Sequence, residues 1–249
     1  MSDFNRDYPR PATAGAADMA VDAGLRAFML GVYNKVGLGL LISAALAYVT
    51  SSVAPVRDLL FVVSPDGRLV GMTILGMIVA FSPLAVLLIG RLAFKQSPRS
   101  SGVVYWLVVA LFGASLGDIA LIYQVSSIFM TFLITAAAFG GLSLIGYTTK
   151  RDLTAFGSFL IVGLIGLIIA SVVNIFLHSS ALAFAVNIIG VLIFAGLIAF
   201  DTQRLKMTYY QLGGDQAAMG VATNYGALSL YLDFLNLFLF LLRLMGGRR

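Results

Sequence analysis

Three aspartates of this sequence lie inside long apolar runs, where a carboxylate is costly to bury: Asp118, Asp201 and Asp233. Ionisable groups at membrane depth usually face a helix-bundle interior or a wet cavity, and they often belong to ion or proton pathways. On a helix, Asp233 shares one face with Ser229, four residues before it, and Asn236, three residues after it. This supporting polar stripe is expected to face protein or water.

Asp201 admits two interpretations. In the first, it pairs with Arg204, one helical turn later, at the membrane interface. In the second, it meets Asp233, because the two acids lie at similar depth on consecutive antiparallel spans. Two carboxyl groups close together in a low dielectric cannot both ionise cheaply, so one keeps a proton and the pair titrates as a unit. Such a pair is a two-state element that pH can bias. When it is protonated, the two carboxyl groups share a hydrogen bond. When it is deprotonated, the two charges push the helices apart or attract a cation.

Metal and catalytic chemistry are narrowly limited by the residue types present. Two aspartates supply too few oxygens for a tight Ca²⁺ cage, which needs roughly six to eight, so Asp201 and Asp233 predict only a weak Ca²⁺ site, suited to conduction. Cysteine is absent and His178 is the single histidine, which excludes disulfides, thiolate metal sites and a Ser-His-Asp triad within one chain. No cofactor is expected. Asp118 is expected to lie apart from the pair as an interhelical hydrogen-bonding group.

The elements that position these acids are membrane-spanning helices. Of the 249 residues, 60% are hydrophobic and only 11% charged, far from the ~25% charged of soluble domains. Such long runs of Leu, Ile, Ala and Gly read as helices rather than as alternating barrel strands. We therefore predict an all-α polytopic membrane protein, a bundle of seven helices, with apolar runs at 31–54, 69–90, 102–122, 127–146, 153–177, 181–204 and 226–245.

Two pairs of glycines are placed to bring helices into close contact. Gly113 and Gly117 form a small-xxx-small pair, and Gly163 and Gly166 lie about one turn apart. Small residues at such spacing let helix backbones approach within a membrane. Both pairs are expected to mark helix–helix interfaces.

Loop charges predict the orientation of the spans. Lysine and arginine gather in alternate loops, which places the N-terminus in the cytoplasm: Arg91, Lys95 and Arg99 in the second, Lys150 and Arg151 in the fourth, and Arg204 and Lys206 in the sixth, with none in the third or fifth. The net charge of +5 accompanies no basic stripe with interleaved aromatics, so nucleic acid is not an expected partner.

The two ends of the chain differ in character from the apolar runs between them. Residues 1–26 predict a mobile cytoplasmic tail, with a short interfacial helix over 18–28, and 27–249 form the transmembrane domain. Arg243, Arg248 and Arg249 follow the seventh run, on the side that seven full crossings would place outside. Either the last run is re-entrant or this end departs from the charge pattern.

At three places the sequence resembles the Bax inhibitor-1 family, in a bacterial-type form. Asp22, Gly24, Leu25, Arg26, Met29 and Tyr33 are similar to the entry to its first span. Phe200–Gln203, reading Phe-Asp-Thr-Gln, looks like its sixth helix. Ala227–Arg243, reading Ala-Leu-Ser-Leu-Tyr-Leu-Asp-Phe-Leu-Asn-Leu-Phe-Leu-Phe-Leu-Leu-Arg, looks like its signature seventh helix.

The resemblance implies a last helix near the bundle centre and a pH-dependent Ca²⁺ leak in the bacterial inner membrane. Asp201 and Asp233 would be the family's paired acids that act as pH sensor and ion pathway, and Arg91 is the nearest candidate for its latch arginine. Asp118 stands where a small hydroxyl residue is expected from the family.

Two other functions remain open. Paired aspartates on the sixth and seventh spans also occur in presenilin-like intramembrane proteases, where an acid and a base activate water. Those enzymes carry Gly-x-Gly before the second acid, whereas this chain has Leu230, Tyr231 and Leu232, so we expect no enzyme. The other alternative is a non-conducting regulator that binds a membrane protease or stress-response partner. No GxxxxGK[ST] phosphate loop supports pumping.

Overall fold

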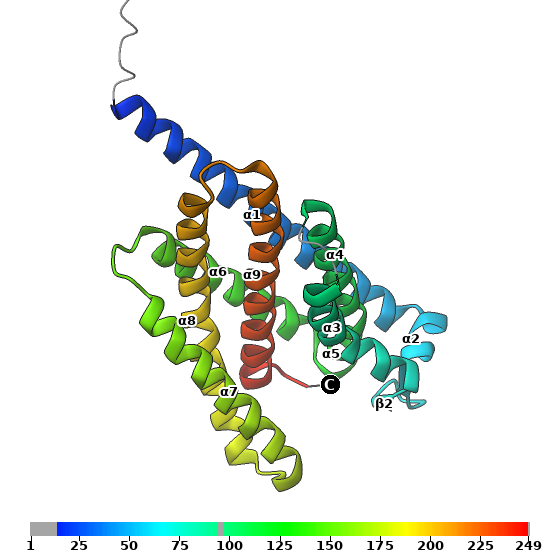
Figure 1. The fold of residues 1–249 in the computed structure, drawn as a ribbon. Helices are drawn as coiled ribbons and strands as arrows, with labels where there is room; N and C mark the ends of the chain where they lie inside the picture. The colour runs from blue at the N-terminus through cyan, green and yellow to red at the C-terminus, as the bar shows by residue number, and fades with distance from the viewer. Residues whose placement is uncertain (1–13, 94–96, 249) are drawn as a thin grey trace, which may run out of the picture.

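The computed structural model describes residues 14–93 and 97–248, with side chains over 23–90 and 97–248. Within these residues the chain is almost wholly helical (Figure 1). The elements in chain order are α1 (Ala14–Ser52), α2 (Ala54–Leu60), β1 (Phe61–Val63), β2 (Leu69–Met72), α3 (Ile74–Ala93), α4 (Pro98–Ser115), α5 (Gly117–Ile122), α6 (Val125–Thr148), α7 (Thr154–Leu177), α8 (Ser180–Leu212) and α9 (Gln216–Met245).

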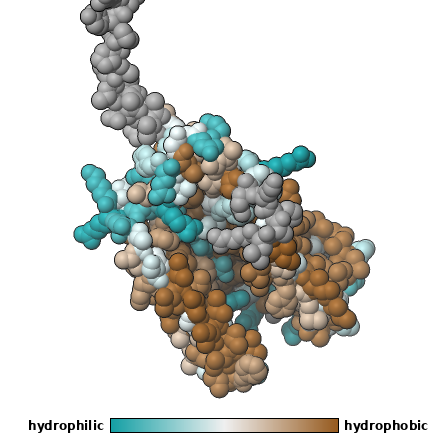
Figure 2. Space-filling view, viewed as in Figure 1, coloured by the Kyte–Doolittle hydropathy of each residue, from teal (hydrophilic) through white to brown (hydrophobic). Residues whose placement is uncertain are grey.

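The predicted all-α membrane bundle is confirmed. Six stretches are long and apolar enough to cross a membrane, namely α1, α4 with α5, α6, α7, α8 and α9. The seventh predicted span corresponds to α3, whose apolar stretch Ile74–Gly90 is shorter than the others. In Figure 2 hydrophilic residues gather at one end of the molecule and a brown apolar surface covers the helices below. The exposed side chains of α7 include Val162 and Phe176, as expected of a lipid-facing helix.

The start predicted for the second span, at residue 69, was wrong. Leu69–Met72 forms β2, which pairs antiparallel with β1. Pro65 and Gly67 make the turn, and Gly67 takes φ 77°, a conformation that glycine adopts readily. The helix begins only after Thr73, whose Oγ1 accepts a 3.0 Å hydrogen bond from the Gly76 amide.

The N-terminal segment is more helical than expected. Helix α1 already begins at Ala14, so the predicted boundary at residue 26 falls inside a continuous helix. Leu25, Phe28 and Met29 are buried in the main core against α4 and α9. These apolar contacts hold the segment that was expected to lie at the interface. Residues 1–13 of the predicted tail lie outside the described residues.

Helix α9 occupies the middle of the bundle, as the resemblance implies. It packs against α1, α4, α6 and α8. Within its apolar 18-residue stretch, 56% is buried, compared with 11–33% for the corresponding stretches of the other spans. It is one continuous helix of 30 residues, or about 45 Å. Its end lies beside the α5–α6 connection, where the backbone amide of Gln124 donates a 3.0 Å hydrogen bond to Gly247 O. Figure 1 shows this end opposite the α8–α9 turn, so α9 is a continuous helix, long and apolar enough to cross a membrane.

The two glycine pairs behave differently. A Cβ on Gly113 would come within 2.6 Å of Ser43 Cα on α1, and one on Gly117 would meet Thr50 and Phe61, so this pair marks a close helix contact as predicted. Gly163 faces Ile193 at 3.3 Å, but Gly166 has nothing within 4 Å. The prediction for Gly166 was therefore wrong, because its helix α7 has only one buried face.

Candidate functional site

A tight helical hairpin brings the acids of the last two helices to one place. Helix α8 ends at Leu212 and is followed by Gly213 and Gly214, both with positive φ (56° and 90°), a conformation that suits glycine after a helix C-terminus. Asp215 then caps α9, and its Oδ1 accepts hydrogen bonds from the Ala217 and Ala218 amides at 2.9 and 3.1 Å. The chain thus reverses within a few residues, and α8 and α9 run antiparallel in extensive contact.

Asp201 is the most densely bonded residue of the site. Its side chain is buried, and its Oδ2 accepts a short hydrogen bond from Ser229 Oγ of α9. Its Oδ1 lies 3.2 Å from Nη2 of Arg204, which also donates a 3.2 Å hydrogen bond to Ser229 Oγ. Arg204 is half exposed. Asp201, Arg204 and Ser229 therefore form a closed triangle that ties α8 to α9.

Asp233 completes the pair. It is buried, and its carboxyl group lies close enough to Asp201 and Arg204 for both to act on it electrostatically. Its Oδ2 is inaccessible and has no hydrogen-bond partner among the described residues. The structure therefore brings Asp201 and Asp233 together as the second interpretation of Asp201 predicts. It also pairs Asp201 with Arg204, so the two interpretations hold at once.

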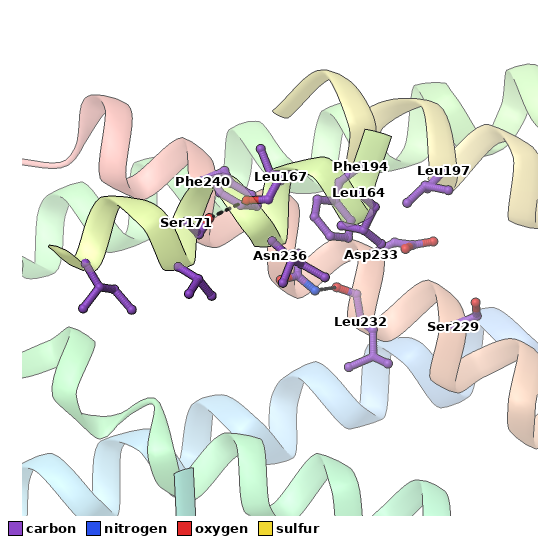
Figure 3. A pocket seen from close by; sticks show the side chains of 13 residues that line it. Leu164, Leu167, Ser171, Phe194, Leu197, Ser229, Leu232, Asp233, Asn236 and Phe240 are labelled. Carbon is purple, nitrogen blue, oxygen red and sulfur yellow. Dashed lines mark hydrogen bonds between the residues drawn. The ribbon is translucent and has the colours of Figure 1, made fainter. Parts of the chain in front are cut away.

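The polar stripe of α9 lines a cavity of about 470 Å³ between α7, α8 and α9. Ser229, Asp233 and Asn236 all contribute to its wall, as predicted for a stripe that faces protein or water rather than lipid. In Figure 3, Asp233 and Asn236 face the apolar side chains of α7 and α8. The Asn236 amide donates a 2.8 Å hydrogen bond to Leu232 O in its own helix, which leaves its side-chain oxygen for another partner.

The donor set at this cavity is suited to a weakly held cation. The Asp233 carboxylate and the side-chain oxygens of Ser229 and Asn236 line the cavity and are oxygen ligands, which hard cations prefer. Over the residues with described side chains, no cluster of three or more Asp, Glu, His or Cys could enclose a metal ion. An ion here would keep much of its water. Apart from Ser171, the remaining wall is apolar.

Three other residues singled out in the sequence lie elsewhere. Asp118 is on α5, and its charged neighbour is Arg243 near the far end of α9. Arg91, the candidate latch, belongs to α3, but its side chain lies outside the described ones. His178 is exposed at the C-terminal cap of α7. From the sequence, an ion pair between Arg204 and Asp201 was considered only as the alternative to the acid pair. The i, i+3 spacing of the two residues is compatible with an ion pair in addition to it.

Comparison with known proteins matches the family described as inhibitor of apoptosis-promoting Bax1 over residues 25–249. This chain belongs to the Bax inhibitor-1 family. The match runs from the buried Leu25, within α1, to the end of the chain and includes both helices that carry the acid pair. The resemblance to this family is thereby confirmed, and the match covers Phe200–Gln203 and Ala227–Arg243 in full.

Bacterial relatives within the Bax inhibitor-1 family match nearly the whole chain. An uncharacterized protein of Caulobacter vibrioides is 64% identical over 100% of both chains. The uncharacterized protein RP147 of Rickettsia prowazekii is 43% identical over 98% of this chain and 99% of its own. Inner membrane protein YbhL of Escherichia coli K12 is 42% identical over 91% of this chain and 94% of its own. The chain is thus similar to bacterial proteins over nearly the whole length of each.

Replacing Arg204 with glutamine is expected to lower the thermal unfolding midpoint by a few degrees. The change leaves the buried Asp201 carboxylate without its cation, and because Arg204 is half exposed the cost is about 1 kcal/mol, or ~2–4 °C for a domain of this size. The measurement is thermal unfolding of Arg204→Gln in detergent. In an Asp201→Asn background the same change should cost almost nothing; equal losses in both backgrounds would show that the ion pair contributes no stability.

Proposed function

We propose that this Bax inhibitor-1 family member is a passive, pH-sensitive leak for Ca²⁺, with Asp201 and Asp233 as the sensor and as a weak site on the ion pathway. The observation that carries the proposal is the buried, unpartnered Oδ2 of Asp233 beside the Asp201 carboxyl group, on the wall of a cavity with a polar stripe. A buried polar oxygen without a partner is costly. A proton on the pair or a cation in the cavity would relieve that cost.

The sign of the pH response follows from the charge of the pair. When one proton is shared, the two carboxyl groups carry a single negative charge, which Arg204 offsets at 3.2 Å from Asp201. When that proton leaves, two negative charges face each other across α8 and α9, which repels the helices and attracts a divalent cation. We therefore expect the flux of Ca²⁺ to rise with pH and to fall on acidification.

The proposal includes no enzymatic step and no cofactor. Leu230 and Tyr231, which stand where an intramembrane aspartyl protease has its glycine motif, are fully buried. These bulky side chains stand in place of the glycine motif, which argues against proteolysis. The ion would move down its gradient, since no phosphate-binding loop is present to couple transport to ATP.

We also propose a location and an orientation. The printed name of the Escherichia coli relative, inner membrane protein, supports the bacterial inner membrane for this chain as well. Alternating loop charge supports a cytoplasmic N-terminus. With an odd number of crossings, the end of α9 and its arginines would then face the periplasm.

The deciding experiment measures Ca²⁺ flux into liposomes that contain the purified full chain, over a series of pH values equal on both sides. Flux well above that of protein-free liposomes, rising with pH, is the expected result. Flux indistinguishable from protein-free liposomes at every pH would reject conduction. Flux that is present but independent of pH would retain the leak and reject the sensor.

A further inference from the structure

A second, larger hollow lies on the other side of α9. Its volume is about 800 Å³, and it is bounded by α1, α5, α6 and α9. Phe234, Leu235 and Phe238 form its α9 wall, on the helix face opposite Asp233. No charged residue lines it, and the hydroxyl of Ser43, on its α1 wall, is already bonded to Val109 O and Tyr231. We call this hollow the apolar groove.

The apolar groove has the length of a lipid chain. Its α1 wall extends from Gly37 to Ser52, about 22 Å at the helical rise per residue, whereas one leaflet of hydrocarbon is ~15 Å deep. One turn before Gly37, α1 touches α6 through Tyr33 and Phe139, whose ring centroids are 6.2 Å apart. Beyond that contact, small residues such as Ala44 leave the space open along α1.

A fixed positive charge lies beside the other end of the apolar groove. The backbone after α9 is held against the start of α6, where the side-chain amide of Gln124 donates a 3.3 Å hydrogen bond to Arg248 O. The Arg248 guanidinium lies 6.0 Å from the ring centroid of Tyr123 and is exposed. Across the described side chains, no carboxylate forms an ion pair with it. Val125, the residue after Gln124, lines the groove.

We propose that the apolar groove binds one acyl chain of an anionic phospholipid whose phosphate is held by Arg248. Lipid tails in the bilayer are as apolar as the groove, so burial alone gives no preference. The preference comes from the fit along α1 and from charge-assisted hydrogen bonds between guanidinium and phosphate. A lipid partner also accounts for arginine at the end of α9, where the loop-charge pattern predicts none. The inference does not depend on ion conduction.

Native mass spectrometry of the purified full chain with added phosphatidylglycerol or phosphatidylcholine tests this site. The expected result is one retained phosphatidylglycerol per chain and weaker retention of phosphatidylcholine. Ala44→Phe fills the groove and should lower phosphatidylglycerol occupancy about tenfold, or ~1.4 kcal/mol. Ala45→Phe is the matched control, because Ala45 is the exposed neighbour on α1 that does not line the groove, and it should retain the lipid.

The charge of the site is tested separately. Arg248→Gln should remove the preference for phosphatidylglycerol over phosphatidylcholine. Arg243→Gln should keep the preference, because Arg243 lies over the ring of Phe240, which lines the cavity that contains Asp233. Equal lipid retention by Ala44→Phe and Ala45→Phe would overturn the site, as would an unchanged preference in Arg248→Gln. A dimer mass that Ala44→Phe abolishes would show instead that a second copy of the chain covers the groove.

Discussion

Asn at position 201 or 233 is expected to abolish the pH dependence of Ca²⁺ flux. In Asp233→Asn, position 233 stays neutral at every pH, so the pair holds at most one negative charge and the flux should remain at its acidic level. In Asp201→Asn, Asp233 keeps its carboxyl group but loses the neighbouring acid with which it interacts. At the most alkaline pH of the series, we expect about a tenfold loss of flux, or ~1.4 kcal/mol in the opening equilibrium.

A third aspartate of the same chain provides the control for this experiment. Asp118 also lies in a membrane span, but its charged neighbour is Arg243 rather than the acid pair, so Asp118→Asn should keep the wild-type profile. Replacing a buried carboxyl group with its isosteric amide removes a buried charge, so unfolding midpoints should not fall far enough to explain lost flux. Wild-type pH profiles in both Asp201→Asn and Asp233→Asn would contradict the sensor.

The polar stripe shows what local spacing can predict. Positions 229, 233 and 236 share a face in any helix, so their common cavity was predictable before the fold was known. The meeting of Asp201 with Asp233 needed one further step, the antiparallel course of consecutive spans. The closed triangle of Asp201, Arg204 and Ser229 depends on how α8 and α9 are rotated about their axes, which the pattern of a single sequence does not specify.

The β-hairpin shows where apolar runs mislead. Residues 69–72 are apolar enough to continue into the span that follows, so hydropathy alone joins them to it. The structure separates them at Thr73, whose hydroxyl donates a 2.6 Å hydrogen bond to Leu59 O and caps α3 through the Gly76 amide. A threonine immediately before an apolar run was a readable signal for the start of a helix. The contact of this side chain with Leu59, in contrast, depends on the tertiary structure and could not be predicted from the local sequence.

Glycine pairs show the same limit, and they lead to the second large expected effect. Spacing identifies residues that share a helix face but not whether a partner helix covers that face. Gly113 packs on α1 at Ser43, whereas Gly166 has nothing within 4 Å. Alanine at either position gains up to ~1 kcal/mol in helix propensity, so a difference between the two variants isolates the cost of contact.

Gly113→Ala is expected to be clearly less stable than Gly166→Ala. The new Cβ would lie 2.6 Å from Ser43 Cα and 3.1 Å from Ser43 O, and backbone atoms cannot rotate away. Moving α1 at Ser43 also strains its hydrogen bonds to Val109 O at 3.0 Å and to Tyr231 at 2.7 Å. Overpacking of this kind costs about 1–3 kcal/mol, which exceeds the propensity gain.

Thermal unfolding of both glycine variants in the same detergent measures this difference. Gly166→Ala should match or exceed the wild-type midpoint, and Gly113→Ala should fall below it by ~2–4 °C for each net kcal/mol. Because Ser43 bonds Tyr231 on α9, the loss at Gly113 would also loosen the central helix against α1. Equal midpoints for the two variants would mean that α1 and α4 separate at Gly113 without cost, and the close contact between these helices would then contribute nothing to stability.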